Sequence, residues 1–73
     1  MSKTYAVVIE KADGNFSAYV PDLPGCVAVG DTVNECEESI QEAIEAHIHV
    51  MREQDIAVPE PSSLAREIEV ELA

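Results

Sequence analysis

The sequence predicts an α+β domain with the element order β-β-β-α-β, in which one helix covers one face of a small, mainly antiparallel sheet. Three observations support this prediction. The turn signal Asp13-Gly14 separates two apolar runs, an apolar periodicity of 3.6 residues begins near residue 33, and residues 67–72 alternate strictly between acidic and apolar side chains. A helix packed on one side of a sheet buries the apolar surfaces of both elements.

The first two strands are expected at residues 5–10 and 15–20, because both runs are rich in β-branched and aromatic residues. Asp13-Gly14 suits a type I′ turn, whose two central residues need positive φ. This turn sets the register by placing Ala12 opposite Asn15, Lys11 opposite Phe16, Ile9 opposite Ala18 and Val7 opposite Val20. The inward face then carries Tyr5, Val7, Ile9, Phe16, Ala18 and Val20, and the opposite face carries Ala6, Val8, Glu10, Ser17 and Tyr19.

A proline-flanked corner follows the second strand. Pro21 and Pro24 fix φ and favour an extended conformation at the residue before each of them, while Gly25 can supply a positive φ. The chain is therefore expected to bend within residues 21–25 and to enter a third strand at residues 26–29.

A long helix is expected at residues 33–54. Thr32 and Glu35 have the spacing of a capping box, in which each side chain accepts a hydrogen bond from a backbone N–H at the start of the helix. Apolar residues and one histidine recur at three- and four-residue spacing and form the face directed at the sheet: Val33, Cys36, Ile40, Ala43, Ile44, His47, Ile48 and Met51.

The rest of the chain predicts a connecting arm and a fourth strand. Residues 55–63 include two prolines and two serines and cannot form a helix or a central strand. In residues 67–72, Ile68, Val70 and Leu72 alternate with three glutamates, so the apolar side chains are expected to face inward.

Length and charge restrict the functional classes. The 73 residues suffice for a single domain spanning 1–73, and a domain this small gains stability from association, so a homo-oligomer is expected. Fifteen acidic residues against four Lys and Arg give a net charge of −11, which opposes direct binding to nucleic acid and favours a basic protein partner. The same charge could also serve solubility alone. Without a membrane span or signal-peptide core, the chain is expected in the cytoplasm.

The sequence offers little support for catalysis or a cofactor. Cys26 and Cys36 lack the spacing of a zinc or redox motif and are expected to be buried thiols. His47 and His49 are two residues apart, so they do not share a helix face as metal ligands would. A metal-dependent nuclease using Glu10, Asp22 and Glu45 is an alternative that no spacing supports. We therefore predict a protein that is not an enzyme and has no metal or cofactor.

Two surfaces remain as candidate binding sites. Glu38, Glu42 and Glu45 are neighbours at helical spacing and form an acidic surface, which either contacts a basic partner or is simply solvated. Val8 and Tyr19 lie on the uncovered sheet face and are candidate contacts between copies of the chain.

These segments resemble the N-terminal domain of HicB antitoxins over nearly the whole chain. The specific part is Pro21-Asp22-Leu23-Pro24-Gly25-Cys26, supported by the flanking strands, Gly30-Asp31-Thr32 and Glu42-Ala43-Ile44. The resemblance implies a truncated ribonuclease-H-like fold that acts by binding. It also implies a partner, the small basic HicA toxin, whose mRNA-cleaving histidine site the antitoxin covers. We expect Asp22, Glu38, Glu42 and Glu45 to contact that toxin.

The chain departs from the HicB pattern at its end. HicB antitoxins typically continue into a helix-turn-helix or ribbon-helix-helix domain, whereas this sequence stops at Ala73. We therefore expect no C-terminal DNA-binding domain here. The alternative function is that of a homo-oligomeric HicB-like domain with a regulatory role and no toxin partner.

Overall fold

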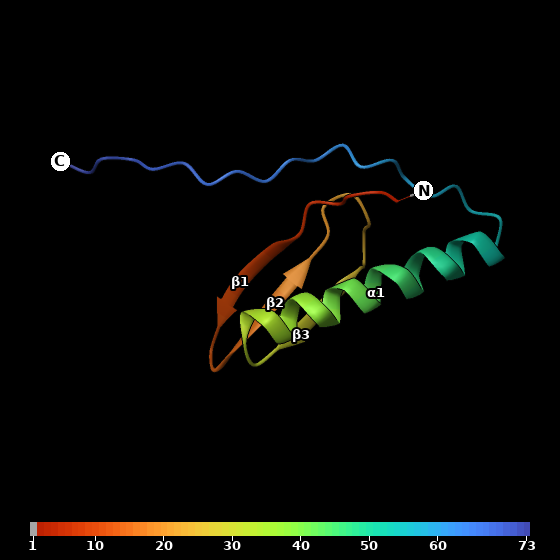
Figure 1. Ribbon diagram of the computed structural model, residues 1–73, viewed down its shortest axis with the longest axis horizontal. Helices are drawn as coiled ribbons and strands as arrows, with labels where there is room; N and C mark the ends of the chain where they lie inside the picture. The colour runs from red at the N-terminus through yellow and green to blue at the C-terminus, as the bar shows by residue number, and fades with distance from the viewer. Residues whose placement is uncertain (1) are drawn as a thin grey trace.

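The computed structural model describes residues 2–73 and contains one three-stranded sheet and one helix (Figure 1). The strands are β1 (Val8–Ala12), β2 (Asn15–Tyr19) and β3 (Val27–Gly30), and the helix is α1 (Val33–Glu53). The sheet order is β1-β2-β3 with both pairs antiparallel, so β1 and β3 are the edges. The predicted α+β arrangement, with one helix on one face of an antiparallel sheet, is confirmed.

The β1–β2 hairpin has the predicted register. Ala12 pairs with Asn15, Lys11 with Phe16 and Ile9 with Ala18. In the turn Gly14 has a φ of +78° but Asp13 does not have a positive φ, so the predicted type I′ turn does not form although its register does. The ladder ends at the pair Val8 and Tyr19, so β1 begins three residues later than predicted, and the expected pair of Val7 with Val20 does not form. On the other side of β2, the N–H of Val20 continues the register with β3 by donating to the carbonyl of Cys26, 3.3 Å away.

The corner after β2 consists of two consecutive tight turns. The N–H of Leu23 donates to the carbonyl of Val20 and the N–H of Cys26 donates to the carbonyl of Leu23, each at 3.1 Å. Gly25 follows Pro24 with a φ of +83°, as the third residue of a type II turn requires. The bent corner is confirmed, and it directs the Leu23 side chain into the core, where it is fully buried.

The helix begins and ends close to the predicted residues. Thr32 caps it, since its hydroxyl accepts a hydrogen bond from the N–H of Glu35 at 3.1 Å, and the Glu35 carboxylate accepts one from the N–H of Asp31 at 3.1 Å. The first turn lies directly against β3 at Gly30. A Cβ built at Gly30 would lie 2.5 Å from the backbone nitrogen of Cys36, so a glycine is needed at this approach.

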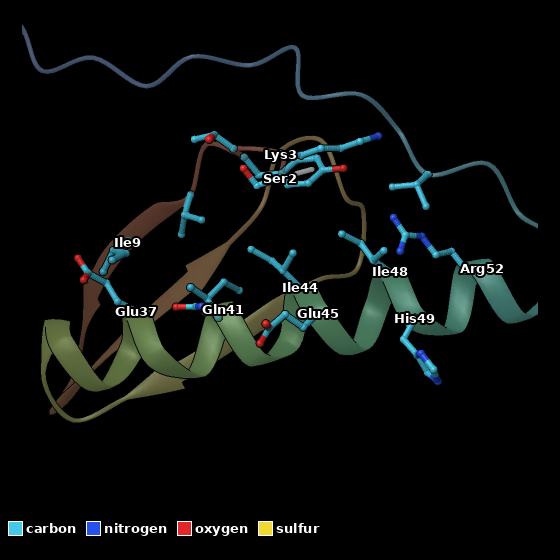
Figure 2. Close-up of a pocket in the computed structure, with 15 residues that line it drawn as sticks. Ser2, Lys3, Ile9, Glu37, Gln41, Ile44, Glu45, Ile48, His49 and Arg52 are labelled. Carbon is cyan, nitrogen blue, oxygen red and sulfur yellow. The ribbon is translucent and has the colours of Figure 1, made fainter.

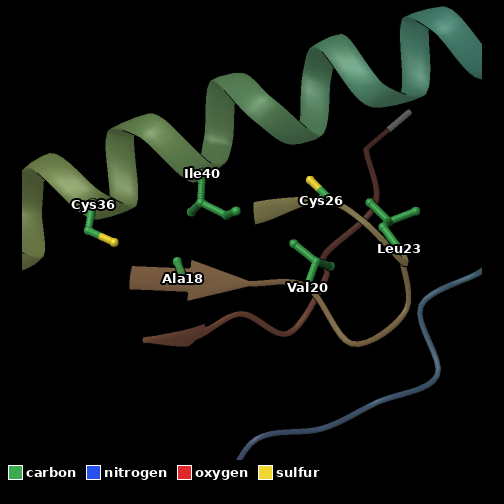
Figure 3. Packing of buried hydrophobic residues seen from close by; sticks show 6 residues of the cluster. All are labelled: Ala18, Val20, Leu23, Cys26, Cys36 and Ile40. Carbon is green, nitrogen blue, oxygen red and sulfur yellow. The ribbon is translucent and has the colours of Figure 1, made fainter. Parts of the chain in front are cut away.

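The core lies between α1 and the inner face of β2 and β3, with the corner closing one end (Figure 3). Both cysteines are free and buried in it, as predicted, and burial raises the pKa of the Cys26 thiol. The inner-face residues of the hairpin and the apolar face of α1 pack around this centre. The buried residues are Ala18, Val20, Leu23, Cys26, Cys36 and Ile40.

The predicted fourth strand does not join the sheet. Residues 67–72 run extended past the body, shown in blue in Figure 1, and no residue after Glu53 belongs to a strand or helix in the described chain. The side chains of Ile68, Val70 and Leu72 are 81%, 68% and 92% exposed. The alternation specifies an amphipathic strand, but it does not specify the sheet edge that such a strand needs for its hydrogen bonds.

Candidate functional site

An acidic hollow lies beside the end of β3 and the first turns of α1. It has a volume of about 510 Å³, and four of its lining residues are acidic: Asp31, Glu35, Glu38 and Glu42. Val29, Gly30 and Ser39 complete the lining, which includes no basic side chain. Four carboxylates around one concave surface produce a focused negative potential, which attracts basic groups.

Two of the three glutamates of the predicted acidic surface line this hollow. Glu38 and Glu42 both line this acidic hollow, whereas Glu45 lines a groove on the β1 side of the helix. All three side chains are exposed. Glu35 is the predicted partner of Thr32 in the helix cap, but Glu35, Glu38 and Glu42 are also spaced i, i+3 and i+7, a pattern that places them on one helix face.

The groove on the β1 side is larger and mostly apolar (Figure 2). It has a volume of about 1040 Å³ and separates α1 from the N-terminal segment and β1. Its charged lining residues are Lys3, Glu37, Glu45 and Arg52. Its apolar lining includes Tyr5, Val7, Ile9, Ile40, Ile44 and Ile48.

Asp22 binds the C-terminal segment within the chain. Its carboxylate accepts hydrogen bonds from the N–H groups of Ser62 and Ser63, both at 2.9 Å, and from their hydroxyls at 3.0 and 2.8 Å. Hydrogen bonds to the charged form, led by the one from the N–H of Ser63, lower the pKa of Asp22 to about 2. We call this contact the Asp22 clamp.

The Asp22 clamp is expected to open only at a pH below the one at which aspartate side chains ordinarily become protonated. Because the pKa is lower in the folded state than the usual 3.8, the clamp stabilises the fold fully above pH 3.8 and is lost as the pH falls toward about 2. The amide proton shifts of Ser62 and Ser63, followed by NMR, should titrate near pH 2. In the Asp22→Asn variant the same amides should show no such step. A midpoint at 3.8 or above in the wild-type chain would contradict the clamp.

An apolar patch lies on the sheet face that α1 does not cover. Tyr19, Val27 and Val29 are 42%, 65% and 62% exposed, and Val8 is half-buried. Val8, Tyr19 and Val27 are consecutive partners across the three strands. The patch thus contains both predicted residues and adds two valines. The sequence pattern that could have predicted these two valines is the alternation of side chains along β3, because Val27 and Val29 point to the face opposite Ala28.

The residues considered for chemistry do not gather at one place. Residues 2–73 contain no group of three or more His, Cys, Asp or Glu side chains placed to hold a metal ion. His49 lies 2.9 Å from Glu53 on the exposed side of α1. The described chain also contains no helix with the length and apolar character needed to cross a bilayer.

Residues 5–71 match the HicB-like antitoxin of bacterial toxin-antitoxin systems. The chain belongs to this family. The resemblance predicted from the proline corner is therefore confirmed. HicB-like antitoxins are the non-enzymatic component of such systems, so the prediction of a protein that is not an enzyme is confirmed by the family.

Individual relatives agree with this assignment. The HicB-like chain is 38% identical over 64 residues to an uncharacterized 14.9 kDa protein of Haemophilus phage HP1, covering 88% of this chain and 48% of the phage protein. It thus spans about half the length of that relative. It is 34% identical over 67 residues to a UPF0150 protein of Synechocystis, covering 90% and 85% of the two chains.

A solved structure shares the fold. A chain of the HicA3 and HicB3 toxin-antitoxin complex superposes with a TM-score of 0.71 at 29% identity, over 81% of this chain and 69% of that one. The three-stranded sheet and helix of the HicB-like chain therefore have a counterpart in a toxin-antitoxin assembly.

Proposed function

We propose that this HicB-like chain neutralises a small basic toxin of the HicA type by binding it and covering the site at which the toxin cleaves mRNA. The observation that carries the proposal is the acidic hollow, where Asp31, Glu35, Glu38 and Glu42 surround one concave surface without a basic neighbour among the lining residues. A basic protein gains from this field in both association rate and orientation. The structural similarity to a chain of a HicA3–HicB3 complex supports a partner of this class.

The proposed contact surface extends beyond the acidic hollow. Glu45 continues the acidic face of α1, one turn after Glu42. Asp22 is a further proposed contact, but a basic side chain of the toxin would compete there with the donors of Ser62 and Ser63. Because the target cleaves mRNA, we expect the complex in the cytoplasm. We expect no direct binding to nucleic acid, since the chain carries a net charge of −11.

The basic test is co-purification with a HicA-type protein encoded near this chain. We expect a complex at low salt that weakens as ionic strength rises, because exposed charges are screened within about 8 Å at physiological salt. Toxin activity on mRNA should fall in proportion to the complex formed. The absence of a complex at every ionic strength would rule the proposal out.

Charge reversal in the acidic hollow should slow toxin association. The double variant Glu38→Lys/Glu42→Lys is expected to lower the association rate constant about tenfold or more at low salt, with a smaller effect on dissociation, because it removes steering. Stopped-flow kinetics at two salt concentrations would measure both constants. Glu45→Lys should have a weaker effect, since Glu45 lies outside the acidic hollow.

The matched control makes the same change in net charge elsewhere. Glu67→Lys/Glu69→Lys places two lysines in the exposed C-terminal segment. If this variant slowed association as much as the variant in the acidic hollow, net charge alone would be responsible and the proposed site would be wrong.

A second candidate function is a homo-oligomeric domain with a regulatory role and no toxin partner. The apolar patch of Val8, Tyr19, Val27 and Val29 favours it, because an exposed apolar surface is typical of contacts between chains. In this proposal the patch pairs with itself across a two-fold axis. Tyr19→Asp or Val8→Asp should then convert the oligomer to monomers.

A further inference from the structure

The C-terminal segment 67–72 has the surface of a buried strand but lies in solvent. Its apolar side chains, Ile68, Val70 and Leu72, are at least 68% exposed. In the described chain, none of the hydrogen bonds outside the helix and sheet involves residues 64–73. An amphipathic strand of this kind is stable only when it pairs with a sheet edge and buries its apolar face.

The segment that leads to 67–72 is held firmly against the body. The Tyr5 hydroxyl donates to the carbonyl of Pro59 at 2.6 Å, Lys3 pairs with Glu60 at 2.8 Å, and the Asp22 clamp holds Ser62 and Ser63. Beyond these contacts the chain leaves the body, which gives the molecule a length of 52 Å against 26 and 20 Å in the other directions. Figure 1 shows the C-terminus projecting past the sheet. While the Asp22 clamp is closed, the segment is directed away from its own sheet.

The two free edges of the sheet differ in what they offer to such a strand. Beside β3 lies the acidic hollow, which would repel Glu67, Glu69 and Glu71. Beside β1 lies the apolar groove, where Figure 2 shows Ile44 and Ile48 pointing from α1 toward the N-terminal segment. Lys3 and Arg52 also line this groove and moderate the charge of Glu37 and Glu45.

We propose that residues 67–72 add as a strand to the free edge of β1 in a second copy of the chain, with Ile68, Val70 and Leu72 filling the apolar groove of that copy. The exchange is reciprocal, so it produces a closed two-fold dimer in which each groove is filled by the partner's strand. The sheet of each copy then has four strands. The acidic hollow at the opposite edge stays open, so this assembly does not depend on the proposed toxin binding.

The test begins with the mass of the intact chain in solution. Sedimentation velocity should give a dimer, twice 7.9 kDa, at micromolar concentration. The double variant Ile68→Asp/Val70→Asp should raise the dimer dissociation constant by about 100-fold or more, because two buried side chains become charged. Its helix signal by circular dichroism should be unchanged, since both side chains lie outside the core.

Two further variants assign the contact. Glu69→Gln, on the water-facing side of the same strand, should leave the dimer intact. Tyr19→Asp should also leave it intact, because the outer face is not used in this exchange. If Tyr19→Asp dissociates the dimer and the Ile68/Val70 variant does not, the outer face forms the interface and strand exchange is wrong.

The origin of the strand in each groove is tested by NMR on an equal mixture of carbon-13-labelled and unlabelled chains. Isotope-filtered contacts between the methyl groups of Val70 and Ile48 should appear, since they join two different molecules. A monomeric chain, or methyl contacts found only within one molecule, would overturn the proposal.

Discussion

Replacing Leu23 by alanine is expected to lower the free energy of unfolding by about 2–5 kcal/mol, one of the two largest effects that we predict for this chain. Leu23 is fully buried at the end of the core, where the two turns of the corner hold its backbone on both sides. The backbone cannot collapse into the space left by the side chain, because Pro21 and Pro24 restrict it. Small domains have a total stability of about 5–15 kcal/mol, so much of it would be lost.

Urea denaturation followed by the circular dichroism of α1 would measure the change. Leu64→Ala is the matched control, since it makes the same chemical change at a side chain that is 75% exposed. Both variants should be compared at one low protein concentration, and the control should change stability by less than about 0.5 kcal/mol. Equal effects of the two substitutions would show that the corner does not anchor the core.

The features that could be predicted from sequence are those fixed by neighbouring residues. Asp13-Gly14 determines the hairpin register because the turn geometry involves only adjacent residues. Thr32 and Glu35 determine where α1 begins for the same reason. Gly25 and the two prolines predict the corner. In each case a few adjacent side chains satisfy a local backbone requirement.

The features that could not be predicted depend on residues far apart in the chain. The Asp22 clamp joins residues 40 and 41 positions apart, and no sequence pattern connects an aspartate in a turn with two distant serines. The burial of Leu23 also depends on distant residues, because its side chain belongs to the same core cluster as Cys36 and Ile40 of α1. Of the candidate contacts, Glu38 and Glu42 meet in one hollow, while Glu45 lies in the other groove. Helical spacing alone does not separate them, because it does not show where β3 ends.

The position of residues 67–72 shows the same limit for a whole element. The alternation of Ile68, Val70 and Leu72 specifies the side-chain pattern of a strand. The partner of that strand is determined by where the Asp22 clamp directs the chain and by the charge beside each sheet edge. The family could therefore be predicted from local motifs in the sequence, whereas the position of residues 67–72 depends on contacts between distant parts of the chain.

Replacing Gly30 by alanine is expected to cost about 3 kcal/mol, at the upper end of the usual range for overpacking. The new Cβ would lie 2.5 Å from the nitrogen and 2.8 Å from the Cα of Cys36, and 2.9 Å from the carbonyl carbon of Glu35. All three are backbone atoms of the first turns of α1, so no side-chain rotation can relieve the contact. The helix must move away from β3, which would also widen the acidic hollow lined by Gly30 and Glu35.

Gly14→Ala is the control that separates this clash from the general effect of losing a glycine. Gly14 has a φ of +78° but nothing within 4 Å of a Cβ, so its substitution should cost only the local backbone strain, about 1–2 kcal/mol. Gly30 does not have a positive φ, and a Gly→Ala change at such a position normally stabilises a protein by about 0.4–1 kcal/mol through the unfolded state. Thermal and urea denaturation of both variants therefore test the sign as well as the size of the effect. A neutral or stabilising Gly30→Ala would mean that α1 does not pack against β3 as closely as the structure shows.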